Sequence, residues 1–162
     1  MVASALFAAL ISICAWISIP VGDIAFTLQT FGIFLALGVL GGKWGCASIC
    51  VYLMLGVAGV PVFSAFQGAL VVLLGPTGGY LWGFLAAGLV YWGFEKLCKP
   101  IGIISAILVC YGCGCFWFMR YAGGTVGFVA AAAKCVLPYL IPDAVKLWLA
   151  YTLSNRVRKH IK

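Results

Sequence analysis

Long apolar stretches, broken only by short runs of glycine, proline and charged residues, dominate this sequence. Of its 162 residues 65% are hydrophobic and 8% are charged, and the only acids are Asp23, Glu95 and Asp143. A soluble domain of this size has too little interior to bury so much apolar surface. The stretches are also too long to be strands of a membrane barrel. We therefore predict an all-α integral membrane protein, in which spans of about 20 residues allow six helices at most.

Turn signals divide the chain into six predicted spans within a single domain, 1–162. We expect spans at 2–19, 30–40, 45–58, 80–94, 101–119 and 143–156, and a short interfacial helix within 126–139. The third and fourth spans are joined by a long loop, 59–79, with an apolar middle. Irregular backbone at membrane depth needs protein or a water-filled cavity around it. This loop is therefore predicted to fold into the mouth of a cavity.

Basic residues are unevenly distributed among the alternate loops. With a cytoplasmic N-terminus, the inside set is Lys43, Lys96, Lys99, Arg156, Arg158, Lys159 and Lys162, and the outside set is Arg120 and Lys134. Cytoplasmic loops are enriched in lysine and arginine, so both termini are predicted to be cytoplasmic. The basic C-terminal end is expected to lie near anionic lipid heads, and the net charge of +7 does not indicate nucleic-acid binding.

Asp143 and Lys146 stand three residues apart in an apolar segment, at the start of the last predicted span. On a helix that begins near Pro142, positions i and i+3 share a face. Ionisable side chains are costly in a bilayer and usually face a cavity, a partner or a substrate. The pair suits a small polar ligand, because a carboxylate accepts from N–H groups and an ammonium donates to oxygen. The alternative is an ion pair that only pins two helices together.

Further polar side chains lie near the predicted outer ends of the spans. Gln67 stands in an aromatic part of the long loop, where it is expected to contact either a ligand or water. Thr77 is placed to cap the fourth span, and the hydroxyl of Tyr80 is placed to point into the cavity. Gln29 opens the second span. A buried amide at this position contacts either a ligand or another helix, and the sequence favours neither.

Ala5 and Ala9 form a small-xxx-small pattern in the first span. Small side chains let a second helix approach closely. That helix belongs either to this chain, as internal packing, or to a partner protein.

The eight cysteines do not form a recognisable metal or catalytic motif. Cys110, Cys113 and Cys115 are the densest group, but no histidine, aspartate or glutamate lies near them in the sequence. A metal site would need ligands from distant spans. A Ser-His-Asp set, paired carboxylates and a phosphate loop are also missing from the sequence, so we do not expect an enzyme.

Several of these segments together resemble one family. They are Ile17–Pro20, Phe26–Thr30, Leu40–Lys43, Gly59–Phe63, Leu74–Tyr80 and Ile141–Lys146. In this order, and over nearly the whole chain, they are similar to BioY, the biotin-specific substrate-binding (S) component of energy-coupling factor (ECF) transporters. The resemblance implies a six-helix membrane protein that binds biotin in an outward pocket, covered by the loops after the first and third spans. Asp143 and Lys146 would form the polar clamp on biotin, and no cofactor is implied.

The same resemblance implies protein partners and a location. Ala5 and Ala9 match the alanine signature that contacts the transmembrane coupling (T) subunit, through which two cytoplasmic ATPases drive transport. The chain would be a multi-pass protein of the bacterial cytoplasmic membrane. In one departure from the family pattern, Gln67 stands where a basic residue is usual.

Two other functions are compatible with the sequence. One is an S component for another vitamin, such as thiamine or riboflavin. The other is a structural membrane protein without a ligand, in which Asp143 and Lys146 bond only each other and no open cavity lies near Tyr80. A membrane enzyme that uses the cysteines is a more distant alternative.

Overall fold

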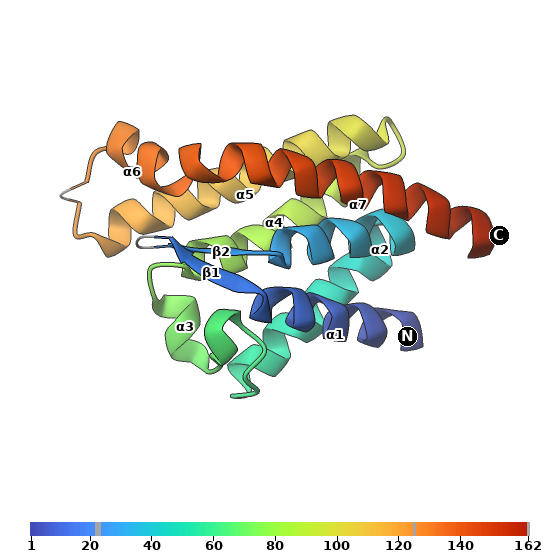
Figure 1. Ribbon diagram of the computed structural model, residues 1–162, viewed down its shortest axis with the longest axis horizontal. Helices are drawn as coiled ribbons and strands as arrows, with labels where there is room; N and C mark the ends of the chain where they lie inside the picture. The colour runs from blue at the N-terminus through green and yellow to red at the C-terminus, as the bar shows by residue number, and fades with distance from the viewer. Residues whose placement is uncertain (22–23, 125, 162) are drawn as a thin grey trace.

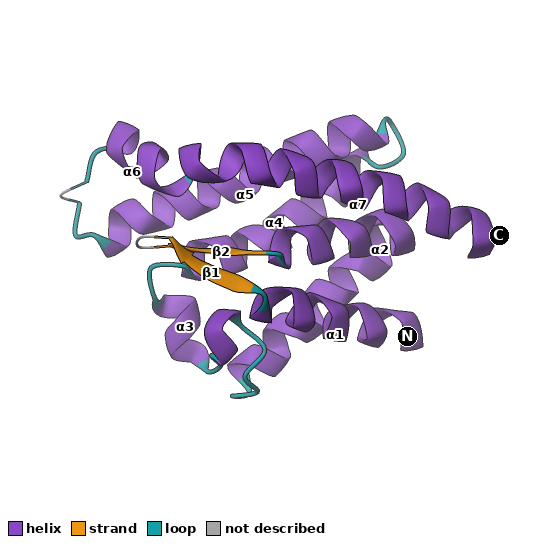
Figure 2. Ribbon diagram, viewed as in Figure 1, coloured by secondary structure: helices purple, strands orange, loops and turns teal. Residues whose placement is uncertain are grey.

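Long helices and one short β-hairpin make up the fold. The computed structural model describes residues 1–21, 24–124 and 126–161. In chain order the elements are α1 (Val2–Trp16), β1 (Ser18–Val21), β2 (Ile24–Thr27), α2 (Gln29–Val57), η1 (Ser64–Phe66), α3 (Leu70–Leu74), α4 (Gly78–Phe94), α5 (Lys99–Tyr121), α6 (Phe128–Cys135), η2 (Leu137–Tyr139) and α7 (Leu140–Ile161). The hairpin, α3 and α6 gather toward one end of the molecule, and both termini lie toward the other (Figures 1 and 2).

Helix α2 bends sharply at Gly41, whose φ of 81° lies in the left-handed region that favours glycine. The side chains of Gln29 and Tyr52 are hydrogen-bonded at 2.7 Å, although a straight helix would separate these residues by roughly 34 Å. The two halves of α2 therefore fold back on each other (Figure 1). They correspond to the second and third predicted spans. The carboxylate of Glu95 holds the bend by accepting a 2.6 Å hydrogen bond from the N–H of Gly42.

The other predicted helices are present, with shifted ends. Helices α4 and α5 each begin two residues before the predicted start, and α7 extends the last predicted span at both ends. Within the described residues, three stretches are long and apolar enough to cross a membrane, namely Gln29–Val57, Lys99–Tyr121 and Phe128–Lys159. Helices α1 and α4 are shorter, at 15 and 17 residues.

The β-hairpin is absent from the sequence-based prediction, which places the first span at 2–19 and a loop after it. The structure ends α1 at Trp16 and pairs β1 with β2 in antiparallel register, with Ser18 opposite Thr27 and Pro20 opposite Ala25. A proline is tolerated here because both strands of a two-stranded sheet are edge strands. The hairpin delivers Thr27 to the start of α2, beside the site described below.

Helices α4 and α5 pack closely because glycines line their contact. A Cβ atom added at Gly114 would lie 2.6 Å from the ring of Tyr80, and one added at Gly79 would lie 2.3 Å from Cβ of Trp117. Small residues allow such close approach between membrane helices. The contact also fixes the position of the Tyr80 ring.

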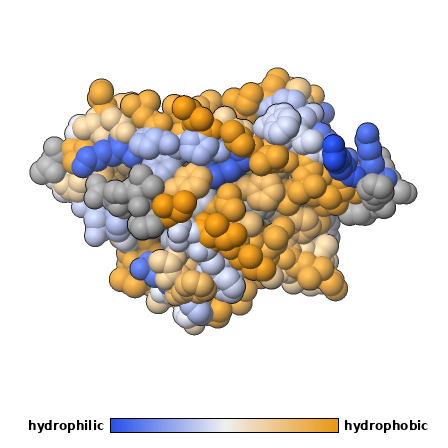
Figure 3. All heavy atoms as spheres, viewed as in Figure 1, coloured by the Kyte–Doolittle hydropathy of each residue, from blue (hydrophilic) through white to orange (hydrophobic). Residues whose placement is uncertain are grey.

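The face of the molecule seen in Figure 3 is largely hydrophobic. On α5, for example, Ile104, Leu108 and Phe116 follow one another at helical spacing and are 58%, 62% and 66% exposed. Soluble monomers rarely expose continuous apolar surface of this kind. These faces are suited to contact lipid, as the sequence predicts for a membrane protein.

Candidate functional site

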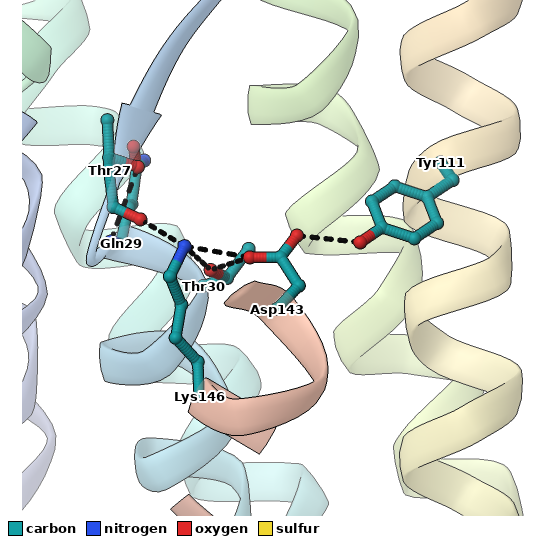
Figure 4. A network of polar contacts seen from close by, with 6 residues as sticks. All are labelled: Thr27, Gln29, Thr30, Tyr111, Asp143 and Lys146. Atoms are coloured by element: carbon teal, nitrogen blue, oxygen red, sulfur yellow. Dashed lines mark hydrogen bonds and ion pairs between the residues drawn. The ribbon is translucent and has the colours of Figure 1, made fainter. Parts of the chain in front are cut away.

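Asp143 and Lys146 form an ion pair in the first turns of α7. The Nζ atom of Lys146 lies 2.7 Å from Oδ1 of Asp143, and each residue is only 5% exposed. The i, i+3 spacing expected from the sequence thus places both groups on one helix face. That face is turned toward the protein interior (Figure 4).

Three other residues complete a polar network around the pair. Lys146 donates to the carbonyl of Thr27 at 2.6 Å and to the hydroxyl of Thr30 at 3.3 Å. Asp143 accepts from the hydroxyls of Thr30 at 3.2 Å and Tyr111 at 2.7 Å. The network therefore joins the end of β2, the start of α2, the middle of α5 and the start of α7 (Figure 4).

The network has zero net charge and is well satisfied. All three N–H groups of the Lys146 ammonium have acceptors, namely Thr27, Thr30 and Asp143. The ammonium also lies 3.8 Å from the centroid of the Phe26 ring, which adds a cation–π contact. Among the described residues, every buried side-chain nitrogen or oxygen has a hydrogen-bond partner. The prediction that the pair would bond only within itself, made for a structural protein, is wrong.

The network lines a small inner cavity of about 60 Å³. Its polar lining also includes Gln29, Ser64 and Thr77, and aromatic walls come from Phe63, Tyr80, Phe84 and Tyr139. A few polar groups in an aromatic cavity are typical of a site for a small organic ligand. The structural alternative also predicts that no open cavity lies near Tyr80, whereas Tyr80 lines this one.

A larger outer hollow of about 640 Å³ adjoins the inner cavity. The two have Ala25, Ser64, Val72 and Thr77 in common as lining residues, so they lie side by side. Segment 59–79 supplies most of the outer lining, which agrees with its predicted position at the mouth of a cavity.

Gln29, Thr77 and Tyr80 all line the inner cavity. Gln29 donates to the hydroxyl of Tyr52 and so combines a cavity position with a bond between the halves of α2. The hydroxyl of Tyr80 donates to the carbonyl of Cys135 instead of pointing freely into the cavity. Thr77 precedes α4 but makes no side-chain capping bond.

Gln67 lies apart from the other candidate residues. Its side chain is exposed and lines only the outer hollow. The site also contains Tyr111, which the sequence analysis does not single out. A tyrosine in the middle of an apolar span signals a buried hydroxyl that needs a partner, but that signal does not say which partner.

Segment 60–69, here called the lid, lines the cavity through Phe63 and Ser64 and is fastened to α1 and α2. The indole N–H of Trp16 donates to the carbonyl of Pro61 at 2.8 Å, and its ring stacks on Phe66 with 5.1 Å between centroids. Phe63 is buried and packs edge-on against Tyr52. Phe66 has a φ of 56°, and Ala65 and Ala69 are also left-handed. Left-handed backbone at residues other than glycine is strained and is often found in functional loops.

Ala5 and Ala9 are both exposed on the outer face of α1. Leu6 and Ile13 are 66% and 50% exposed beside them. Within the described residues this face is not used for internal packing. It is therefore accessible to another helix.

The cysteines are all free thiols, and five of the eight are buried. Within the described residues no group of three or more histidine, cysteine, aspartate or glutamate side chains is arranged to hold a metal ion.

Comparisons with known proteins agree with this geometry. The model of the BioY family matches residues 1–162. A probable biotin transporter BioY of Pyrococcus horikoshii is 38% identical, with 95% of this chain and 93% of that protein covered. The biotin transporter BioY of Thermotoga maritima is 36% identical, with 98% and 95% covered. A crystal structure of the S-component for biotin from an ECF-type ABC transporter matches with a TM-score of 0.88 and 26% identity, over 96% of this chain and 88% of that one. The chain therefore belongs to the BioY family.

Proposed function

We propose that this chain binds biotin and serves as the substrate-binding S component of an ECF-type biotin transporter. Family membership and the fold shared with a biotin S-component support this function. The observation that carries the proposal is a buried polar network on the wall of an aromatic cavity. It is built around Asp143 and Lys146 and has no net charge. The whole chain acts as one transmembrane binding domain and needs no cofactor.

The network matches the chemistry of the cyclic urea in biotin. A ureido group carries two N–H donors and one carbonyl acceptor. A carboxylate has about four acceptor positions, and Asp143 uses three of them. Asp143 therefore accepts a ureido N–H, and Lys146 donates to the ureido oxygen by exchanging one of its neutral acceptors. Aromatic side chains such as Phe84 and Tyr139 enclose the apolar part of the ring system.

Ligand entry requires the lid to move. A cavity of about 60 Å³ has room for only a few water molecules, which is less than a bicyclic ring needs. Phe63 and Ser64 of segment 60–69 line this cavity. Outward movement of the segment enlarges the inner cavity and opens it to the outer hollow.

The remaining expectations concern orientation and partners. The chain spans the bacterial cytoplasmic membrane several times, with both termini in the cytoplasm. Both termini lie toward one end of the molecule, opposite to the hairpin, α3 and α6 (Figure 1). The excess of basic residues in the predicted inner loops supports this orientation. Ala5 and Ala9 on the exposed face of α1 dock the T subunit, which connects the chain to two ATPases.

The proposal is tested by equilibrium binding of biotin to the purified chain in detergent, followed through tryptophan fluorescence. Thiamine and riboflavin serve as control ligands. We expect saturable binding of biotin and no binding of the controls. A folded sample that fails to bind biotin, or that prefers a control vitamin, would refute the proposed function.

A further inference from the structure

Charge is distributed unequally between the inner cavity and the adjacent outer hollow. Asp143 and Lys146 both line the inner cavity. Among the described residues that line the outer hollow there is no charged side chain, and its polar groups come from Ser64, Gln67, Thr77 and Tyr121. A ligand that extends from one hollow to the other thus meets ions at one end only.

The inner cavity is poorly suited to a carboxylate. Asp143 and Lys146 together have zero net charge, and both are 5% exposed. A neutral urea leaves that balance unchanged. A carboxylate would place a second anion beside Asp143, with one ammonium to share between them, and would leave a net negative charge away from water.

A carboxylate in the outer hollow is solvated by water and does not face a cation. The hollow has a volume of about 640 Å³, ten times that of the inner cavity, and includes the exposed Gln67. A carboxylate placed there keeps its hydration and does not need a counter-ion. Neutral hydrogen bonds from Ser64, Gln67 and Thr77 serve an amide or an ester as well as an acid.

We propose, on the basis of the proposed function, that the cyclic urea occupies the inner cavity and the acid end of the tail lies in the outer hollow, unpaired with any cation. The ligands of this chain are then a class, namely bicyclic ureas whose tail ends in an acid, a neutral amide or a longer extension. Selectivity resides in the urea, and the charge of the tail contributes little to affinity.

The test compares biotin with its neutral primary amide in the same binding assay. We expect the two Kd values to agree within about threefold, because no ion pair is lost with the charge. A larger loss for the amide would show that a cation binds the carboxylate and would overturn the inference. If neither ligand binds, the proposed function itself fails, so the two failures are distinguishable.

A Gln67→Arg variant provides a second test, in which the preference for biotin over its amide is expected to increase. Gln67 is exposed, so the substitution requires no repacking of the core. If the tail carboxylate lies in the outer hollow, the new guanidinium should raise the preference for biotin over the amide by about threefold or more. An unchanged preference in the variant would place the carboxylate elsewhere and would refute the inference.

Discussion

Replacing Asp143 by asparagine separates the ligand-binding role of the network from its structural role. The asparagine keeps the size of the side chain and one oxygen, but it presents an N–H where a carboxylate oxygen stood. The hydroxyl of Tyr111, now 2.7 Å from Oδ2, can rotate to accept from that N–H. A ureido N–H has no such freedom, so the ligand loses its acceptor.

The size of both effects follows from the burial of the pair. Hydrogen bonds to charged groups contribute about 1.5–3 kcal/mol, so biotin affinity in Asp143→Asn should fall by about 10- to 150-fold. The variant also leaves the ammonium of Lys146, 5% exposed, without a counter-ion. Removing one partner of a buried pair costs about 3–5 kcal/mol of stability. The thermal unfolding midpoint should therefore fall as well.

A second substitution, Lys146→Met, distinguishes the two effects. In the double variant no buried charge remains unpaired, so the thermal midpoint should recover most of its loss. Biotin affinity should stay low, because the acceptor is still missing. The assays are tryptophan fluorescence for Kd and a thermal melt in detergent. Wild-type affinity in a folded Asp143→Asn sample, or restored affinity in the double variant, would refute this account of the site.

Three further substitutions test the lid, the helix contact and the docking face. In Trp16→Phe an aromatic ring is kept but the hydrogen bond to the carbonyl of Pro61 is lost, so biotin should dissociate about two- to tenfold faster in stopped-flow chase experiments. An unchanged rate would mean that this bond does not hold the lid. Gly114→Ala places a methyl group 2.6 Å from the ring of Tyr80. This clash should cost about 1–3 kcal/mol of stability and weaken biotin binding. The matched control is Gly112→Ala, where an added Cβ meets open space, and this variant should bind biotin like the wild type. Ala9→Trp should leave biotin affinity unchanged but abolish co-purification with the T subunit and ATPases; loss of affinity with retained assembly would contradict the docking role.

The class of the molecule and the position of its helices follow from local features of the sequence. Apolar stretches of membrane length cannot be buried in a soluble domain of this size, and Gly41 and Pro100 mark breaks whatever the rest of the chain does. The pairing of Asp143 with Lys146 is also local, because the helical repeat alone places positions i and i+3 side by side. The resemblance of the linked motifs to BioY adds the function, which the comparisons bear out.

The composition of the site was decided by tertiary packing. Thr30 and Tyr111 contact Asp143 across 113 and 32 residues of chain, and no periodicity in the sequence encodes such distances. Gln29 reaches Tyr52 only because α2 folds back on itself. Gln67 lies outside the inner cavity, whereas Ser64, three residues earlier, lines it, and left-handed backbone at 65–66 separates the two. Hydrogen bonds between distant segments depend on which helices pack together. The sequence thus determined the charged pair, and the packing of α2, α5 and α7 determined which groups satisfy it and which hollow it faces.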